Sequence, residues 1–190
     1  MHRVGNLAVT SVSRTIFDLA VSVGFEQAVV IADAALHRGL TTKEDLAAEL
    51  EHGRGRRGHE QAVKVIGFAD QRSESVGESR SRVGMFRAQL TIPDLQVLFH
   101  RPDGSELART DFAWAAARLV GEFDGLSKYG RLLRPGQTPA DVYIAERIRQ
   151  DALHDLGYEM VRWIWSELAR PDRLYPRIQA AIDRAARLHR

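Results

Sequence analysis

The sequence predicts an α/β protein in which a mixed four-stranded sheet flanked by helices follows a small helical region. Two observations predict this fold. Up to about residue 70, apolar residues recur at helical spacing and the segments end at glycines. Beyond that point, strand-like segments are joined by turns and a long helix leads to a last strand. We therefore expect an N-terminal helical region at 1–69 and a sheet-containing domain at 70–190.

The helical region carries the start and stop signals of four helices. Serines cap the first helix, and Gly24 and Gly39 follow the ends of the first two. Thr41 or Thr42 caps the third, whose first turn is acidic. A basic, glycine-rich stretch at 53–61 joins it to the fourth. The predicted helices cover residues 11–24, 25–39, 41–53 and 59–70.

The sheet follows a helix predicted at 75–90. A Pro-Asp-Gly turn signal separates the first two strands, and Thr138 caps the long helix, which has Pro139 at its first position. The first three strands fit antiparallel pairing, and the long helix crosses over to the fourth, which favours a mixed sheet. The predicted strands cover residues 96–100, 106–114, 118–124 and 158–165, and the helices cover 138–157 and 173–190.

Composition excludes several classes of protein. A chain of 190 residues with 44% hydrophobic residues can form a sizeable core. The absence of cysteine excludes a disulfide scaffold, a cysteine-based zinc site and a thiol nucleophile. No apolar run approaches the roughly 20 residues that cross a bilayer, and the start lacks an apolar signal sequence, so we expect a cytoplasmic protein with no membrane partner. A net charge of +2 permits nucleic-acid binding without requiring it.

Three carboxylates fall in the middle of the predicted sheet, namely Asp111, Glu122 and Asp124. A sheet core tolerates charge when the charge is paired or holds a metal. If the second and third strands pair antiparallel, Asp111 and Glu122 come close, and Asp124 shares a face with Glu122. One interpretation is a site where hard cations help to hydrolyse phosphodiesters. The other is a pair of strand acids neutralised by Arg109 and Arg118.

The order of these acids resembles the PD-(D/E)XK nuclease superfamily, in which an aspartate precedes a Glu-x-Lys motif on the next strand. The block VGEFDG resembles that of domains related to very-short-patch repair endonucleases, and RIRQDALHDLGYEMVRWIWSEL resembles their following segment. This resemblance covers roughly residues 72–185. The front segment VTSVSRTIFDLA resembles the middle of abortive-infection-type antitoxin proteins of actinobacteria. Those proteins usually carry a winged helix ahead of this region, so the chain looks short at its N-terminus.

The resemblance implies a restriction-endonuclease-like fold and an endonuclease that uses Mg²⁺ or Mn²⁺. It implies that Glu78, from the preceding helix, joins Asp111 and Glu122 in holding the metal. Asp124 stands at the lysine position of the motif and would help to hold the metal or place water. Lys128, one short loop later, would take the catalytic role of the lysine by stabilising the phosphate charge.

DNA is the expected partner, and the expected contacts to it are Lys128, Arg131, Arg134 and Arg149. Arg149 could instead brace Glu122, or lie with Asp151 on a solvated salt-bridge face of its helix. A homodimer would let both strands be cut. The alternative function is a non-catalytic DNA-binding or antitoxin-type regulatory protein that keeps a vestigial nuclease fold and binds a DNA site or a toxin. An oligomeric interaction module is a third reading, which rests on the amphipathic ends of the chain.

Overall fold

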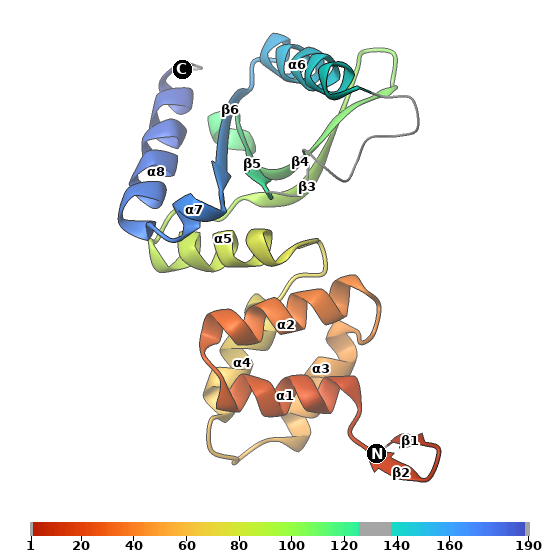
Figure 1. Ribbon diagram of the computed structural model, residues 1–190. Coiled ribbons are helices and arrows are strands. Elements are labelled where there is room, and N and C mark those ends of the chain that lie inside the picture. Colours follow the sequence, from red (N-terminus) through yellow and green to blue (C-terminus); the bar gives the residue numbers. More distant parts are fainter. Residues whose placement is uncertain (1, 126–137, 189–190) are drawn as a thin grey trace. The chain divides into compact units, whose positions relative to one another are not determined.

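The computed structural model describes residues 2–125 and 138–188 (Figure 1). Contacts divide the chain into two compact units, Met1–Val83 and Gly84–Arg190. The helix α5 (Val76–Arg87) crosses this boundary, so its N-terminal part belongs to the first unit. Along the described chain, no helix is both long enough and apolar enough to cross a membrane.

The first unit is helical apart from a short hairpin at its start. The strands β1 (His2–Val4) and β2 (Leu7–Val9) pair antiparallel, and the sequence pattern does not predict them. The predicted helices follow, and their facing sides bury one apolar core. These helices are α1 (Val12–Ser22), α2 (Phe25–His37), α3 (Lys43–His52) and α4 (His59–Phe68).

Capping side chains fix where two of these helices begin. The hydroxyl of Ser11 accepts a hydrogen bond from the backbone N–H of Arg14 at 3.1 Å. At the start of α3, the side chains of Thr42 and Asp45 each accept a hydrogen bond from the other's backbone N–H, which is a capping box. Of the two threonines that the sequence offers as caps, Thr42 is therefore the one used.

The buried carboxylate of Asp33 ties residues 70–83 to the first unit. It accepts hydrogen bonds from the backbone N–H of Asp70 and the hydroxyl of Ser79, and an ion pair of 2.8 Å joins it to Arg82. Burial raises the pKa of Asp33, and the charge of Arg82 and these hydrogen bonds oppose that rise. The sequence-based division at residue 69/70 puts this segment with the sheet, whereas the compact units meet at Val83 and Gly84 because Asp33 holds the segment.

The described residues of the second unit form a four-stranded sheet in the order β3-β4-β5-β6. The pairs β3/β4 and β4/β5 are antiparallel, whereas β5 and β6 are parallel. The helix α6 makes the crossover between the parallel strands, so the predicted mixed sheet flanked by helices is confirmed. The strands are β3 (Asp94–His100), β4 (Glu106–Trp114), β5 (Leu119–Asp124) and β6 (Glu159–Ile164); the helices are η1 (Ala115–Ala117), α6 (Pro139–Asp155), α7 (Trp165–Leu168) and α8 (Pro171–Leu188).

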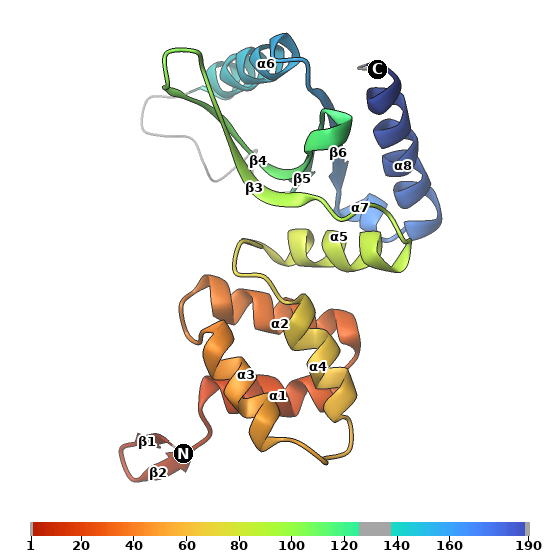
Figure 2. The same ribbon diagram turned by 180° about the vertical axis from the view of Figure 1, so that it is seen from behind.

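Helices cover both faces of this sheet (Figures 1 and 2). On one face, Phe123 of β5 shares an apolar core with Ile178 of α8. On the other face, Val120 of β5 shares a core with Leu153 of α6. Successive strand residues point to opposite faces, so Glu122, which precedes Phe123, lies on the α6 face. The sheet therefore places the acids of β5 beneath α6 and away from α8.

Candidate functional site

Two of the predicted acids, Asp111 and Glu122, lie on neighbouring antiparallel strands. Phe112 of β4 pairs with Gly121 of β5, so Asp111 and Glu122 are the next residues along the two strands. The carboxylate of Asp111 accepts a hydrogen bond of 2.8 Å from the backbone N–H of Phe123. The antiparallel pairing expected from the sequence is therefore confirmed, and it brings these two acids together.

The two acids differ in how far they are withdrawn from solvent. Glu122 is 3% exposed, whereas Asp111 is half-buried. Asp124, two residues after Glu122 on the same strand, shares its face and is also half-buried. Because a buried carboxylate is costly unless it is compensated, the partners of Glu122 decide what this site can do.

Both oxygens of Glu122 contact arginines. Arg149 Nη2 lies 2.6 Å from Glu122 Oε1, and Arg162 Nε lies 2.9 Å from Glu122 Oε2. The parallel register of β5 and β6 sets Arg162 directly beside Glu122, while Arg149 reaches down from α6. Two secondary-structure elements thus deliver one guanidinium each to the same buried carboxylate.

A second glutamate completes the cluster. Glu146 lies three residues before Arg149 on α6, and Arg149 donates to it through Nε at 3.0 Å and Nη2 at 2.7 Å. Arg162 Nη2 donates to the same carboxylate. We call Glu122, Glu146, Arg149 and Arg162 the Glu122 quartet; it holds two negative and two positive charges.

The acids of the quartet favour the charged form of Arg149. Burial disfavours the charge on Arg149, but hydrogen bonds to Glu146 and the charges of Glu122 and Glu146 outweigh burial and raise the pKa of Arg149 above its ordinary value. Arg149 Nη1 also donates to the backbone carbonyl of Arg109 at 3.4 Å, which links α6 to β4. The quartet therefore joins β5, β6 and α6 as well as balancing charge.

The other predicted site residues are placed as follows. Glu78 belongs to the first unit, where its carboxylate accepts hydrogen bonds from the backbone N–H of Glu74 and the hydroxyl of Ser75. Lys128, Arg131 and Arg134 lie outside the described residues. Arg149, expected either at DNA or beside Glu122, contacts Glu122.

The carboxylates of the two acids suit a divalent cation, but the arginines would compete with that cation for the oxygens of Glu122. Asp111 and Glu122 offer the carboxylate oxygens that Mg²⁺ prefers. Among residues 2–125 and 138–188, however, no three histidine or acidic side chains gather in a group that could hold a metal ion. A cation at Glu122 would compete with Arg149 and Arg162, which already contact its two oxygens.

Sequence reasoning did not single out Arg162 and Glu146. Arg162 is a charged residue between apolar neighbours in the last strand of the sheet. A charge at such a position indicates a buried partner on the neighbouring strand, which is Glu122 on β5. Glu146 and Arg149 share a face of α6 at a spacing of three residues, which was visible in the sequence. Neither signal identifies the partner, because the register of β6 against β5 was unknown.

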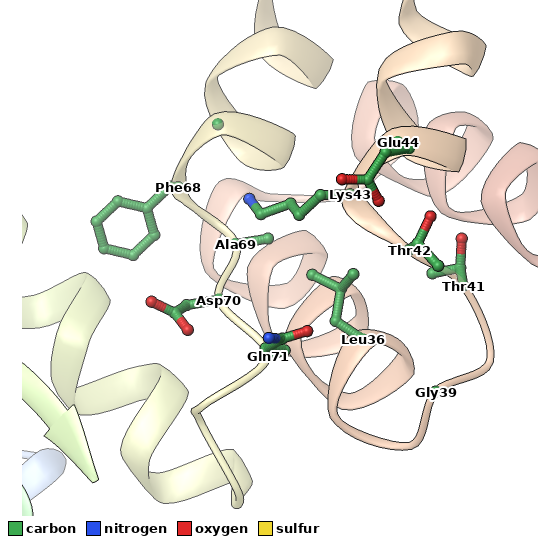
Figure 3. A pocket seen from close by; sticks show the side chains of 11 residues that line it. Leu36, Gly39, Thr41, Thr42, Lys43, Glu44, Phe68, Ala69, Asp70 and Gln71 are labelled. Carbon is green, nitrogen blue, oxygen red and sulfur yellow. The ribbon is translucent and has the colours of Figure 1, made fainter. Parts of the chain in front are cut away.

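A cavity of about 610 Å³ lies in the first unit, beside the start of α3 (Figure 3). Its lysine, Lys43, donates a hydrogen bond of 2.7 Å to the backbone carbonyl of Ile66, near the end of α4. Burial lowers the pKa of Lys43, and the charges of Asp70 and Asp33 oppose this. Asp70, also in the lining, pairs with Arg72 at 2.7 Å. These charges are engaged in holding helix ends and turns together, so the cavity does not define a ligand.

Comparisons with known proteins find two relatives in Mycobacterium tuberculosis. They are "Uncharacterized protein MT2308" of strain CDC 1551 / Oshkosh and "Uncharacterized protein Rv2248" of strain ATCC 25618 / H37Rv. Each is 31% identical over 186 residues, which cover 97% of this chain and 65% of the relative. The chain thus spans just under two thirds of the length of these relatives. No protein-family profile matches the chain, and no solved structure matches it.

The quartet predicts a large cost for removing Arg162. The change Arg162→Ala leaves the buried Glu122 with one of its two arginines, and we expect the free energy of unfolding to fall by about 3 kcal/mol. Urea unfolding of the full chain, followed by circular dichroism, measures this. The control is Arg147→Ala on the same helix as Arg149, where an exposed pair with Asp151 is worth less than about 1 kcal/mol. Equal effects of the two changes would contradict a stabilising role for the quartet.

Proposed function

We propose that the protein is a metal-dependent DNA endonuclease of the PD-(D/E)XK type, which hydrolyses phosphodiester bonds with Mg²⁺ or Mn²⁺. The observation that carries the proposal is the meeting of Asp111 and Glu122 on adjacent antiparallel strands of a mixed sheet. Asp124 follows on the same face. This arrangement supports the proposal because two or more carboxylates must point at one place to hold a hard cation.

Each residue has a part in the proposed reaction. Asp111 and Glu122 would hold the metal. The bound cation would neutralise charge on the phosphate oxygens and lower the pKa of the attacking water. Asp124 would orient that water, and Lys128 would stabilise the phosphate. Arg131 and Arg134 would contact the DNA backbone beside it.

The Glu122 quartet is compatible with this proposal because Glu146 gives both arginines a second partner. Arg149 and Arg162 each donate to Glu146 as well as to Glu122. When a cation takes an oxygen of Glu122, the displaced guanidinium keeps a carboxylate partner, so no buried charge is left alone. Arg149 released in this way would be free to contact a DNA phosphate, the role that the sequence suggested for it.

A second function is favoured by the same contacts. Glu122 has both oxygens on arginines, and Asp124 stands where the nuclease motif has lysine. A protein with its acids neutralised permanently would be a non-catalytic DNA-binding or antitoxin-type regulator with a vestigial nuclease fold. Its partners would be a DNA site, a toxin or a second copy of the chain. Under either function we propose a cytoplasmic location.

Cleavage by Asp111 variants separates the two functions. We expect purified protein with Mg²⁺ or Mn²⁺ to nick supercoiled plasmid. If Asp111 holds the metal directly, Asp111→Asn should lower the nicking rate by more than the roughly 10- to 100-fold that loss of a residue outside the metal's ligands costs. The control is Asp151→Asn, an exposed acid on α6. Nicking that survives both Asp111→Asn and Glu122→Gln in folded protein would sink the nuclease proposal. DNA binding without metal-dependent nicking would favour the regulator.

Competition between arginine and metal gives a second test. In Arg149→Met one oxygen of Glu122 loses its guanidinium, so we expect Mg²⁺ to bind more tightly than to the unchanged protein. Isothermal titration calorimetry measures the affinity, and Arg147→Met is the matched control on the exposed face of α6. Weaker or unchanged Mg²⁺ binding in Arg149→Met would contradict the proposed competition between Arg149 and the metal at Glu122.

A further inference from the structure

The outer face of α8 carries a row of arginines. The helix buries one side in the core of the second unit, through Leu174, Tyr175, Ile178, Ala181, Ile182 and Ala185. At 3.6 residues per turn, four exposed arginines on the other side fall within an arc of about 80°. They span roughly 21 Å along the helix axis at 1.5 Å per residue. We call Arg173, Arg177, Arg184 and Arg187 the α8 arginine stripe.

Most of the charge in this stripe is uncompensated. Arg177 pairs with Glu167 at 2.7 Å and donates to the backbone carbonyl of Arg162. Within the part of the chain that the structure describes, Arg173, Arg184 and Arg187 make no ion pair.

The acids of α8 do not interrupt the stripe. At this helical period Asp172 and Asp183 lie about 80–100° to one side of Arg173. Asp183 is thus about 40° from Arg187, beside the edge of the stripe and outside it. Asp183 accepts a hydrogen bond from Gln179. The small residue Ala180 occupies the middle of the row, so nothing bulky stands between the two ends of the stripe.

We propose that the α8 arginine stripe binds the phosphate backbone of double-stranded DNA. Like charges at spacings of three and four residues repel each other and weaken a helix slightly, and a polyanion laid along the row relieves that repulsion. Arginine also donates to phosphate oxygens in a bidentate way. Arginine is the common base throughout this sequence, so the alignment of the four residues, and not their number, marks this face of α8.

Charge complementarity would also suit an anionic membrane, but the packing of α8 favours DNA. An amphipathic helix that lies on a bilayer buries its apolar face among the lipid chains. The apolar face of α8 is instead occupied by the core of the second unit. Only the charged side is left for a partner, and phosphate-backbone binding needs nothing more.

The stripe is separate from the acids on the other face of the sheet. Glu122 lies on the α6 face, whereas α8 packs on the face that Phe123 contributes to. The stripe would therefore hold DNA without taking part in cleavage. This inference rests on the proposed function in so far as DNA is the partner, but it does not require that the protein cut DNA.

The test measures DNA binding without cleavage. A fluorescent 25-base-pair duplex would be titrated with the full chain in EDTA at several salt concentrations, with anisotropy as the readout. The variant is R173Q/R184Q/R187Q, in which glutamine keeps the helix propensity. The matched control is R3Q/R38Q/R147Q, which removes the same charge from scattered exposed positions. Circular dichroism checks that both variants are folded.

We expect the stripe variant to bind the duplex at least tenfold more weakly than the unchanged protein at about 0.1 M salt. The slope of the logarithm of the binding constant against the logarithm of salt concentration should shrink by roughly 2 to 3, because each lost phosphate contact removes about 0.9. The control should keep most of its slope. Equal losses in both variants would overturn the proposal, as would failure of the unchanged protein to bind the duplex. Binding to phosphatidylserine vesicles that needs the stripe, without such DNA binding, would assign it to a membrane instead.

The outcomes for the stripe and for the proposed function are distinguishable. In one outcome, the stripe variant loses salt-dependent DNA binding while the unchanged protein shows no metal-dependent nicking. That result would support DNA binding by the stripe and contradict the nuclease proposal. In the other outcome, nicking depends on Asp111 but DNA binding is unchanged in the stripe variant. That result would support the nuclease proposal and contradict DNA binding by the stripe.

Discussion

The second unit depends on one buried charge, the carboxylate of Glu122. At 3% exposure it is compatible with folding because Arg162 meets it across the parallel strand pair and Arg149 meets it from α6. These contacts set where α6 sits over the sheet, and Arg149 extends the link to the backbone of β4. An apolar side chain could fill this position without any paired charges. A buried carboxylate at the centre of the sheet therefore marks a candidate functional site.

The same contacts frame the functional question as a competition. A divalent cation at Glu122 would compete with two guanidinium groups for the same two carboxylate oxygens. Glu146 makes the exchange feasible, because it keeps the arginines paired when Glu122 changes partner. Under the nuclease proposal the quartet is the metal-free state of the site. Under the regulatory alternative it is the permanent state, and the acids have become a structural ion-pair network.

Much of the fold could be predicted because its signals are local. The capping box of Thr42, the Pro-Asp-Gly turn and the apolar spacing of the helices are all short-range features of the sequence. The antiparallel pairing that joins Asp111 to Glu122 followed from the short connection between their strands. The boundary at Val83 did not follow, because it depends on Asp33 reaching Arg82, a contact between residues 49 positions apart.

The partners of Glu122 were harder to predict for the same reason. Arg162 became its neighbour through the register of two strands separated by a helix, and periodicity does not fix register. The sequence offered Arg109 and Arg118 as neutralising partners because they are near in the chain. In the structure, Arg118 donates to the backbone carbonyl of Leu156 instead. Side-chain pairing across a sheet is a long-range property, and a single sequence carries little information about it.

A crystal soaked in Mn²⁺ would test most directly whether Glu122 exchanges arginine for a cation. Data collected at a wavelength where manganese scatters anomalously would locate the ion without ambiguity. We expect an anomalous peak between the carboxylates of Asp111 and Glu122, with Arg149 turned away from Glu122. A soaked crystal with no peak at these acids, and with Arg149 and Arg162 both still on Glu122, would contradict the exchange and leave the quartet as a structural network.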